Sequence, residues 1–206
     1  MKKLIFIFIT LFIPFVLEAQ NKLSVKQLLD KTSNRIATDS GVETGFLSKI
    51  YRNGGLESST HGRLLLKGKK FVLETEDMKT WYDGKYQWSF IFEMEEVNVS
   101  EPTQDELNEI NPYELLNLYK RGYSSTYIDS ASRVVLLQTK DKKNNLQEIK
   151  LWISPQYEPN KIEVYTKDSR RIIIEVQSFR SNLNLSPTDF HFNEQNYPDI
   201  EIIDLR

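Results

Sequence analysis

Hydrophobic and polar residues alternate along most of the chain from Glu43 on, which is the pattern of half-buried β-strands. In the first such run, Phe46, Ser48 and Ile50 share one face of the predicted strand, and Leu47 and Lys49 share the other. Runs of this kind predict about ten or eleven strands in all. After the first, the clearest cover residues 57–67, 71–75, 86–92, 123–128, 134–139, 146–153, 161–166 and 171–179.

Short turns join these runs to their neighbours in the sequence. Asn53, Gly54 and Gly55 supply the positive φ angles of a hairpin turn, and Asp83-Gly84 is a second tight-turn signal. Strands joined by such turns pair antiparallel. The sequence therefore predicts one antiparallel sheet, which at this size curls and needs material packed against one face.

Two helices interrupt the strand pattern and are expected to cover the concave face. Ser24 and Gln27 form a capping-box pattern before an apolar stripe, while Asn111 and Pro112 predict a mid-chain helix that ends at Gly122. The first stripe consists of Val25, Leu28, Leu29, Thr32 and Ile36. The fold class is therefore α+β, and the space between helices and sheet is either a filled core or a pocket.

The first residues carry the pattern of an export signal. Lys2 and Lys3 precede an apolar run over residues 4–17, and Ala19 is a small residue suited to a signal peptidase. The run is shorter than the roughly 20 residues of a membrane-spanning helix, which favours a signal that is removed. We expect cleavage after Ala19, with residues 1–19 as signal peptide and residues 20–206 as a single domain.

Charge and cysteine content narrow the function classes. Removing residues 1–19 takes two lysines and one glutamate from the 27 basic and 29 acidic residues, which leaves a formal net charge of −3. This balance argues against nucleic-acid binding, which needs a basic face. The chain has no cysteine, so it carries neither a lipid-anchor cysteine nor a disulfide.

Catalytic and metal-binding signals are weak. His61 and His191 are isolated, and the spacing of a zinc site is missing, so no metal or other cofactor is predicted. Acidic residues cluster at Glu74, Glu76 and Asp77, where strand ends and turns explain solvated charge. An envelope enzyme that uses such carboxylates as acid and base remains an alternative, although we expect no enzyme.

Several short motifs follow one another over nearly all of the chain after the signal. They are Leu28-Leu29-Asp30-Lys31 leading to Phe46, the strand pair from Gly62 to Lys67 with Phe71, Asp83-Gly84-Lys85 with Trp88, Asn111-Pro112 with Leu115 and Leu116, and a closing Phe-x-Phe strand at Asp189 to Phe192. This series of motifs resembles the LolA family of periplasmic lipoprotein carriers.

The resemblance implies an incomplete (half) β-barrel whose helices form a lid over an apolar cavity. The cavity would take the acyl chains of lipoproteins from an inner-membrane ABC-type release complex to an outer-membrane acceptor. The protein would be periplasmic and monomeric, without nucleic-acid binding or stable membrane insertion. The expected lining residues are Leu28, Phe46, Ile50, Leu64, Leu66, Phe71, Leu73, Trp88, Phe90, Leu115 and Leu116.

One position departs from the family pattern. Family members carry Arg-Pro after the lysine that corresponds to Lys67, and that arginine holds the lid shut, whereas this chain has Gly68 and Lys69 there. Lys67, Lys69 or Arg63 could replace it, but lysine lacks the planar fork of arginine. The alternative function is a non-enzymatic envelope sensor or interaction module of the same half-barrel type that binds lipid or lipoprotein.

Overall fold

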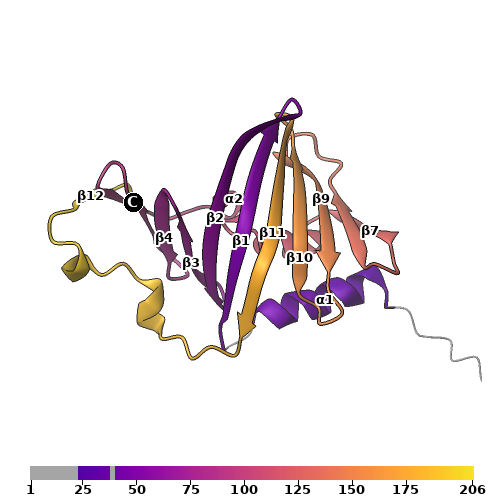
Figure 1. The fold of residues 1–206 in the computed structure, drawn as a ribbon, viewed down its shortest axis with the longest axis horizontal. Coiled ribbons are helices and arrows are strands. Elements are labelled where there is room, and N and C mark those ends of the chain that lie inside the picture. The colour runs from indigo at the N-terminus through magenta and orange to yellow at the C-terminus, as the bar shows by residue number, and fades with distance from the viewer. Residues whose placement is uncertain (1–22, 38–39) are drawn as a thin grey trace, which may run out of the picture.

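The computed structural model describes residues 23–37 and 40–206, so the predicted cleavage after Ala19 lies outside the described residues. The chain forms one open, curved sheet with a few helices (Figure 1). The strands are β1 (Val42–Arg52), β2 (Gly55–Lys67), β3 (Lys70–Thr75), β4 (Met78–Tyr82), β5 (Gln87–Ile91), β6 (Glu96–Ser100), β7 (Ser124–Asp129), β8 (Val134–Gln138), β9 (Leu146–Ile153), β10 (Pro159–Thr166), β11 (Arg170–Ser181) and β12 (Glu201–Asp204). The helices are α1 (Val25–Ile36) and α2 (Gln104–Ile110), with the 3₁₀ helices η1 (Glu114–Lys120), η2 (Pro187–Phe190) and η3 (Glu194–Asn196).

The strand order confirms the predicted fold class and refines it. The order is β12-β6-β5-β4-β3-β2-β1-β11-β10-β9-β8-β7, so the described strands form a 12-stranded sheet rather than the ten or eleven predicted. Neighbours pair antiparallel except β12, which runs parallel to β6. β12 has four residues and joins a partner about a hundred positions earlier, so no local pattern revealed it. The sheet stays open, with β12 and β7 at its edges.

The first helix forms as predicted. Ser24 is the N-cap of α1, and its side chain and that of Gln27 make the reciprocal bonds of a capping box. This arrangement satisfies backbone N–H groups that the first helical turn leaves free. The helix buries Leu28, Leu29 and Ile36 against the sheet.

The predicted start of the mid-chain helix at Asn111 is wrong. Asn111 is the C-cap of α2, and its side chain accepts a hydrogen bond from the backbone N–H of Tyr113 at 3.0 Å. This local bond imitates a helix start, because Asn side chains satisfy backbone groups in turns as well as at N-caps. The predicted helix forms as η1, whose N-cap is Tyr113 without a side-chain hydrogen bond, and the capping box of Thr103 and Glu106 starts the separate helix α2.

The closing Phe-x-Phe strand is also a wrong prediction. Pro187 to Phe190 form the 3₁₀ helix η2, which Ser186 caps. Pro187 lacks the N–H group that a strand needs but fits the first position of a helix. Phe190 and Phe192 are nevertheless buried, with 0% and 3% of their surface exposed.

The two faces of the sheet carry separate hydrophobic clusters. The helix-side core joins α1, η1 and the inward residues of the strands, including Leu29, Val42, Leu64, Leu116, Leu137, Ile149, Leu151 and Ile162. The outer cluster lies on the other face and consists of Val72, Trp81, Trp88, Val97, Val99, Phe190 and Phe192. The segment after β11 supplies Phe190 and Phe192 and leads to β12 (yellow in Figure 1).

Candidate functional site

A groove lies between the helices and the concave face of the sheet. Its volume is about 330 Å³, at the lower end of the range for small-molecule pockets. The sheet contributes Phe46, Ile50, Leu73, Leu146, Val164, Ile172 and Ile174, and the helical side contributes Ile110, Pro112 and Leu115. The groove is therefore apolar on both sides, as a site for hydrocarbon would be.

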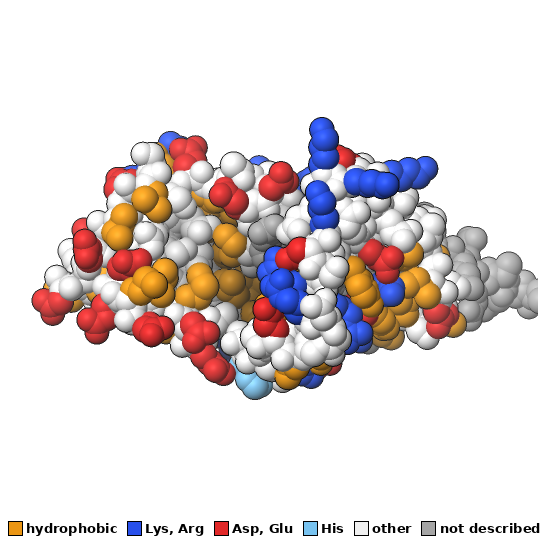
Figure 2. All heavy atoms as spheres, turned by 90° about the horizontal axis from the view of Figure 1, so that it is seen from above, with side chains coloured by type: hydrophobic (Ala, Val, Ile, Leu, Met, Phe, Trp, Pro, Cys, Tyr) orange, Lys and Arg blue, Asp and Glu red, His pale blue; other side chains and the backbone are white. Residues whose placement is uncertain are grey.

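The polar side chains of the groove are mostly uncharged. They are Ser48, Thr60, Thr75, Thr166, Asn108 and Asn145, and Arg170 is the one charged residue among the described lining residues. Seen from above, acidic side chains gather on the left, the side of β3 to β6 (Figure 2). Basic side chains lie mainly in the middle and on the right, and hydrophobic side chains are exposed among them. The face of the molecule in this view therefore changes from mainly acidic at one edge of the sheet to more basic toward the other edge.

Gly62 gives the groove wall its shape near Phe46. The two residues are partners across β1 and β2, and a Cβ atom on Gly62 would lie 2.2 Å from Cζ of the Phe46 ring. Only a glycine lets the ring lie so close to the neighbouring strand. The ring therefore lies against the sheet instead of filling the groove.

The structure divides the predicted lining residues into three sets. Phe46, Ile50, Leu73 and Leu115 line the groove. Leu28, Leu64, Leu66, Phe71 and Leu116 belong to the buried helix-side core. Trp88 and Phe90 lie at the outer cluster.

Strand register explains why Trp88 and Phe90 are on the other face. Trp88 pairs with Trp81, and Trp81 pairs with Val72, so the three side chains share one face of the sheet. Leu73 is next to Val72 and therefore points the opposite way. The sequence pattern showed which residues share a face, but not which face the helices cover.

Sequence reasoning missed Ile110, Pro112 and Leu146 and also three apolar groove residues on two neighbouring strands. Val164, Ile172 and Ile174 lie on β10 and β11. β11 pairs with β1, so that Ile50 faces Ile172 across the two strands. Their alternation was visible in the sequence, but the pairing joins segments more than a hundred residues apart, for which the chain carries no local signal.

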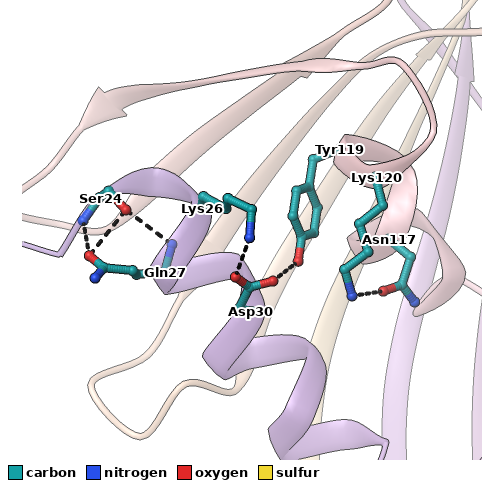
Figure 3. A network of polar contacts seen from close by, with 7 residues as sticks. All are labelled: Ser24, Lys26, Gln27, Asp30, Asn117, Tyr119 and Lys120. Carbon is teal, nitrogen blue, oxygen red and sulfur yellow. Dashed lines mark hydrogen bonds and ion pairs between the residues drawn. The ribbon is translucent and has the colours of Figure 1, made fainter.

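Hydrogen bonds fasten α1 to η1 on the concave side. The Tyr119 hydroxyl donates to Asp30, which also accepts from Lys26 at 2.9 Å (Figure 3). Hydrogen bonds from Tyr119 and Lys26 lower the pKa of Asp30, while burial and the Asp30 carboxylate raise the pKa of Tyr119. One turn further along α1, Ser33 donates to Asn117 at 2.9 Å.

A half-buried ion pair fastens the end of α1 to the sheet. Arg35 Nη2 lies 2.7 Å from Glu158 Oε1, beside β10. The Arg35 guanidinium also lies 5.4 Å from the ring centre of Phe179 on β11. The helices thus form a lid that is held both to itself and to the strands.

The sequence model described as outer membrane lipoprotein carrier protein LolA matches residues 16–168. The chain belongs to this family. No curated protein matches it in sequence at a significant level.

Solved structures resemble this chain at low sequence identity. An uncharacterized conserved protein from Thermus thermophilus has 10% identity and a TM-score of 0.55, over 88% of this chain and 99% of that one. A LolA superfamily protein from Nitrosomonas europaea has 12% identity, a TM-score of 0.47, and coverage of 82% and 98%. A putative outer membrane lipoprotein-sorting protein domain from Vibrio parahaemolyticus has 12% identity, a TM-score of 0.45, and coverage of 82% and 97%.

Gly68 occupies the position where the LolA resemblance expects a lid-closing arginine, and it forms a turn instead. Gly68 adopts φ +60° in the turn between β2 and β3, a conformation that favours glycine over residues with a Cβ atom. Lys67 donates to the Leu185 carbonyl at 2.6 Å, and Arg63 pairs with Glu43 at 3.3 Å. These two contacts hold side chains to neighbouring strands and to the C-terminal segment, not to the lid.

Two buried hydroxyl groups lie where the lid meets the sheet. The hydroxyls of Tyr113 and Thr44 have no hydrogen-bond partner among the described residues, although both are buried. Burial raises the pKa of Tyr113, and the nearby Thr44 hydroxyl opposes the shift. A buried polar group without a partner is costly, so this contact is a weak point of the lid.

The titratable groups of this LolA-family chain are dispersed. In the described part, no three His, Asp or Glu side chains are grouped so that they could hold a metal ion. The carboxylates that the sequence singled out are occupied or exposed, with Glu74 3.4 Å from Lys79 and Glu76 3.7 Å from His61. Over residues 23–37 and 40–206, no helix is both long and apolar enough to cross a membrane.

Proposed function

We propose that this protein binds the acyl chains of lipoproteins in the groove and carries them from the inner to the outer membrane. The apolar groove between sheet and lid is the observation that supports this function most directly. Membership of the LolA family supports it independently. The lining is built from side chains that offer hydrocarbon contact and few polar groups, which suits a flexible chain.

The energetics fit a carrier that must also release its cargo. Each methylene group removed from water contributes about 0.8 kcal/mol, so shielding part of a chain makes an insoluble cargo soluble. Hydrocarbon contact has no directional requirement, and release therefore needs only an acceptor with higher affinity. No covalent step is needed, and we propose a non-enzymatic role.

The proposal includes the protein's place and partners. Residues 1–19 would direct export and be removed, and residues 20–206 would act in the periplasm as one domain. An inner-membrane ABC-type release complex would supply the lipoprotein, and an outer-membrane acceptor would take it. The lid contacts Asp30 to Tyr119 and Arg35 to Glu158 would have to loosen when a large cargo enters.

Two substitutions on one strand test the groove. Ile50 lines the groove, whereas Leu47 is on the opposite face of β1, and both side chains are half-buried. Ile50→Asp places a charge among the apolar lining residues and should abolish binding of a synthetic diacylated lipopeptide, since a carboxylate disfavours contact with hydrocarbon. Leu47→Asp should bind as well as the wild-type protein.

Native mass spectrometry of the protein with the lipopeptide measures this directly. Circular dichroism confirms that each variant is folded before binding is compared. If the wild-type protein does not bind the lipopeptide, or if Ile50→Asp binds it normally, the groove is not an acyl-chain site and the proposed function is wrong.

A further inference from the structure

The groove contains one charge, and its position suggests a second kind of ligand. Arg170 is the first residue of β11, and two residues later Ile172 lines the same groove. Alternation along a strand puts both side chains on the concave face. The other polar lining residues are hydroxyls and amides, so among the described lining residues only Arg170 can attract an anion by charge.

The turn before β11 holds this arginine in a fixed orientation. Arg170 Nε donates to Asp168 Oδ2 at 2.7 Å, and the Thr166 hydroxyl donates to Asp168 Oδ1 at 2.5 Å. The Thr166 oxygen also accepts from the backbone N–H of Arg170 at 3.1 Å. A side chain held this way loses little freedom when it binds a further group.

Part of the guanidinium remains available. Asp168 engages Nε, and within the described residues the two terminal nitrogens of Arg170 have no hydrogen-bond partner. The side chain is 34% exposed, so a ligand can reach it. An arginine fork matches the geometry of a carboxylate, with which it forms paired, charge-assisted hydrogen bonds.

We infer that the groove also binds a free fatty acid, with the hydrocarbon chain along the apolar walls and the carboxylate on the Arg170 guanidinium. A volume of about 330 Å³ suits one chain better than several. This inference uses the groove of the proposed function and adds a ligand with a charged head group, which the ester-linked chains of a lipoprotein lack.

Two ligands that differ only in the head group test the inference. Dodecanoate is ionised at pH 7.5, whereas dodecan-1-ol has the same chain length and no charge. By isothermal titration calorimetry, the wild-type protein should bind dodecanoate about tenfold more tightly than dodecan-1-ol, as expected for a charge-assisted hydrogen bond at a partly exposed site. Arg170→Gln should lose this preference and bind dodecan-1-ol unchanged.

The adjacent arginine provides a matched control. Arg171 points to the outer face, where its guanidinium lies 4.8 Å from the ring centre of Tyr51. Arg171→Gln removes the same charge and should keep the preference for dodecanoate. Thermal unfolding followed by circular dichroism should show both variants folded, because neither change removes the backbone bonds of the turn.

Each other outcome has a defined meaning. Equal affinity of the wild-type protein for the two ligands would overturn the inference and leave acyl-chain binding intact. The same holds if Arg171→Gln loses the preference as fully as Arg170→Gln, or if the protein binds the diacylated lipopeptide but neither dodecyl ligand. A protein that binds none of the three ligands would overturn both the inference and the proposed function.

Discussion

The two faces of the sheet bury hydrophobic side chains in different ways. On the outer face, rings pack against rings, with Trp81 and Phe192 at 5.4 Å and Phe192 stacked on Tyr197 at 5.2 Å between ring centres. On the helix side, mostly aliphatic residues form a larger core that leaves the groove beside it. The outer cluster also borders a pocket of about 280 Å³, but Arg63, Glu74, Lys79 and Asp189 line that pocket, whereas the groove on the helix side has Arg170 as the one charged residue among its described lining residues.

The difference follows from what covers each face. The outer cluster is closed by a segment that lies directly on the strands and adapts to them, and Phe190 is fully buried there. The lid consists of α1, α2 and η1, which pack on the helix-side core and leave the groove beside them. The segment that covers the outer cluster lies beyond residue 168, where the family match ends, whereas the lid lies within the match. We therefore expect the outer cluster to serve stability, while the proposed function places ligand binding on the helix side.

The largest expected effect is on the outer face. Phe190→Ala removes a fully buried ring and should lower the free energy of unfolding by about 3–5 kcal/mol, measured by urea denaturation. The control Leu205→Ala changes a side chain that is 63% exposed and should shift stability by less than about 0.5 kcal/mol. At temperatures where Phe190→Ala remains folded, lipopeptide binding should be unchanged, and a parallel loss of binding would show that the two faces are coupled.

The next effect concerns the wall of the groove. Gly62→Ala introduces a Cβ atom 2.2 Å from the Phe46 ring, which must then move into the groove. Such overpacking typically costs about 1–3 kcal/mol, and lipopeptide affinity should fall because the groove becomes smaller. Gly55→Ala on the same strand is the control, since its Cβ atom would meet only the Arg52 carbonyl at 3.6 Å. Unchanged affinity in Gly62→Ala would mean that the ligand does not reach Phe46.

A smaller effect of opposite sign is expected where the lid meets the sheet. Tyr113→Phe removes a buried hydroxyl that lacks a partner, so the free energy of unfolding should rise by about 1 kcal/mol. Tyr123→Phe is the matched control, because the Tyr123 hydroxyl donates to the Leu146 carbonyl at 2.6 Å and its loss should cost about 1 kcal/mol. Destabilisation by Tyr113→Phe would indicate that an ordered water satisfies the hydroxyl.

The smallest expected effect is a pH dependence of the stability that Asp30 in the lid contributes. Hydrogen bonds lower the pKa of Asp30 below its ordinary value of 3.8, so Asp30 stabilises the fold above that pH. The contribution is lost as the pH falls through the lowered pKa, because the carboxylate is then protonated. Wild type and Asp30→Asn should therefore differ in stability at pH 6, and the difference should shrink as the pH falls below 3.8 in urea denaturation. A difference that stays constant below pH 3.8 would point to packing rather than charge.

Some features of the site were readable from the sequence because they depend on neighbours along the chain. The capping box of Ser24 and Gln27 formed as predicted, and the Asn53-Gly54 turn has the positive φ angles expected of it. A capping box at Thr103 and Glu106 was equally readable but was overlooked in favour of Asn111. Phe46, Ile50, Leu73 and Leu115 were predicted as lining and do line the groove.

The sequence by itself determined most of the strands, the hairpin neighbours and which residues share a face, since a period of two and turn chemistry are local properties. The tertiary structure decided which face the helices cover, and so placed Trp88 and Phe90 away from the groove. It also decided that β11 pairs with β1 and that β12 joins β6, which bring distant segments together. Such pairings depend on the packing of the whole chain, because register and facing are fixed only when one side of the sheet becomes buried.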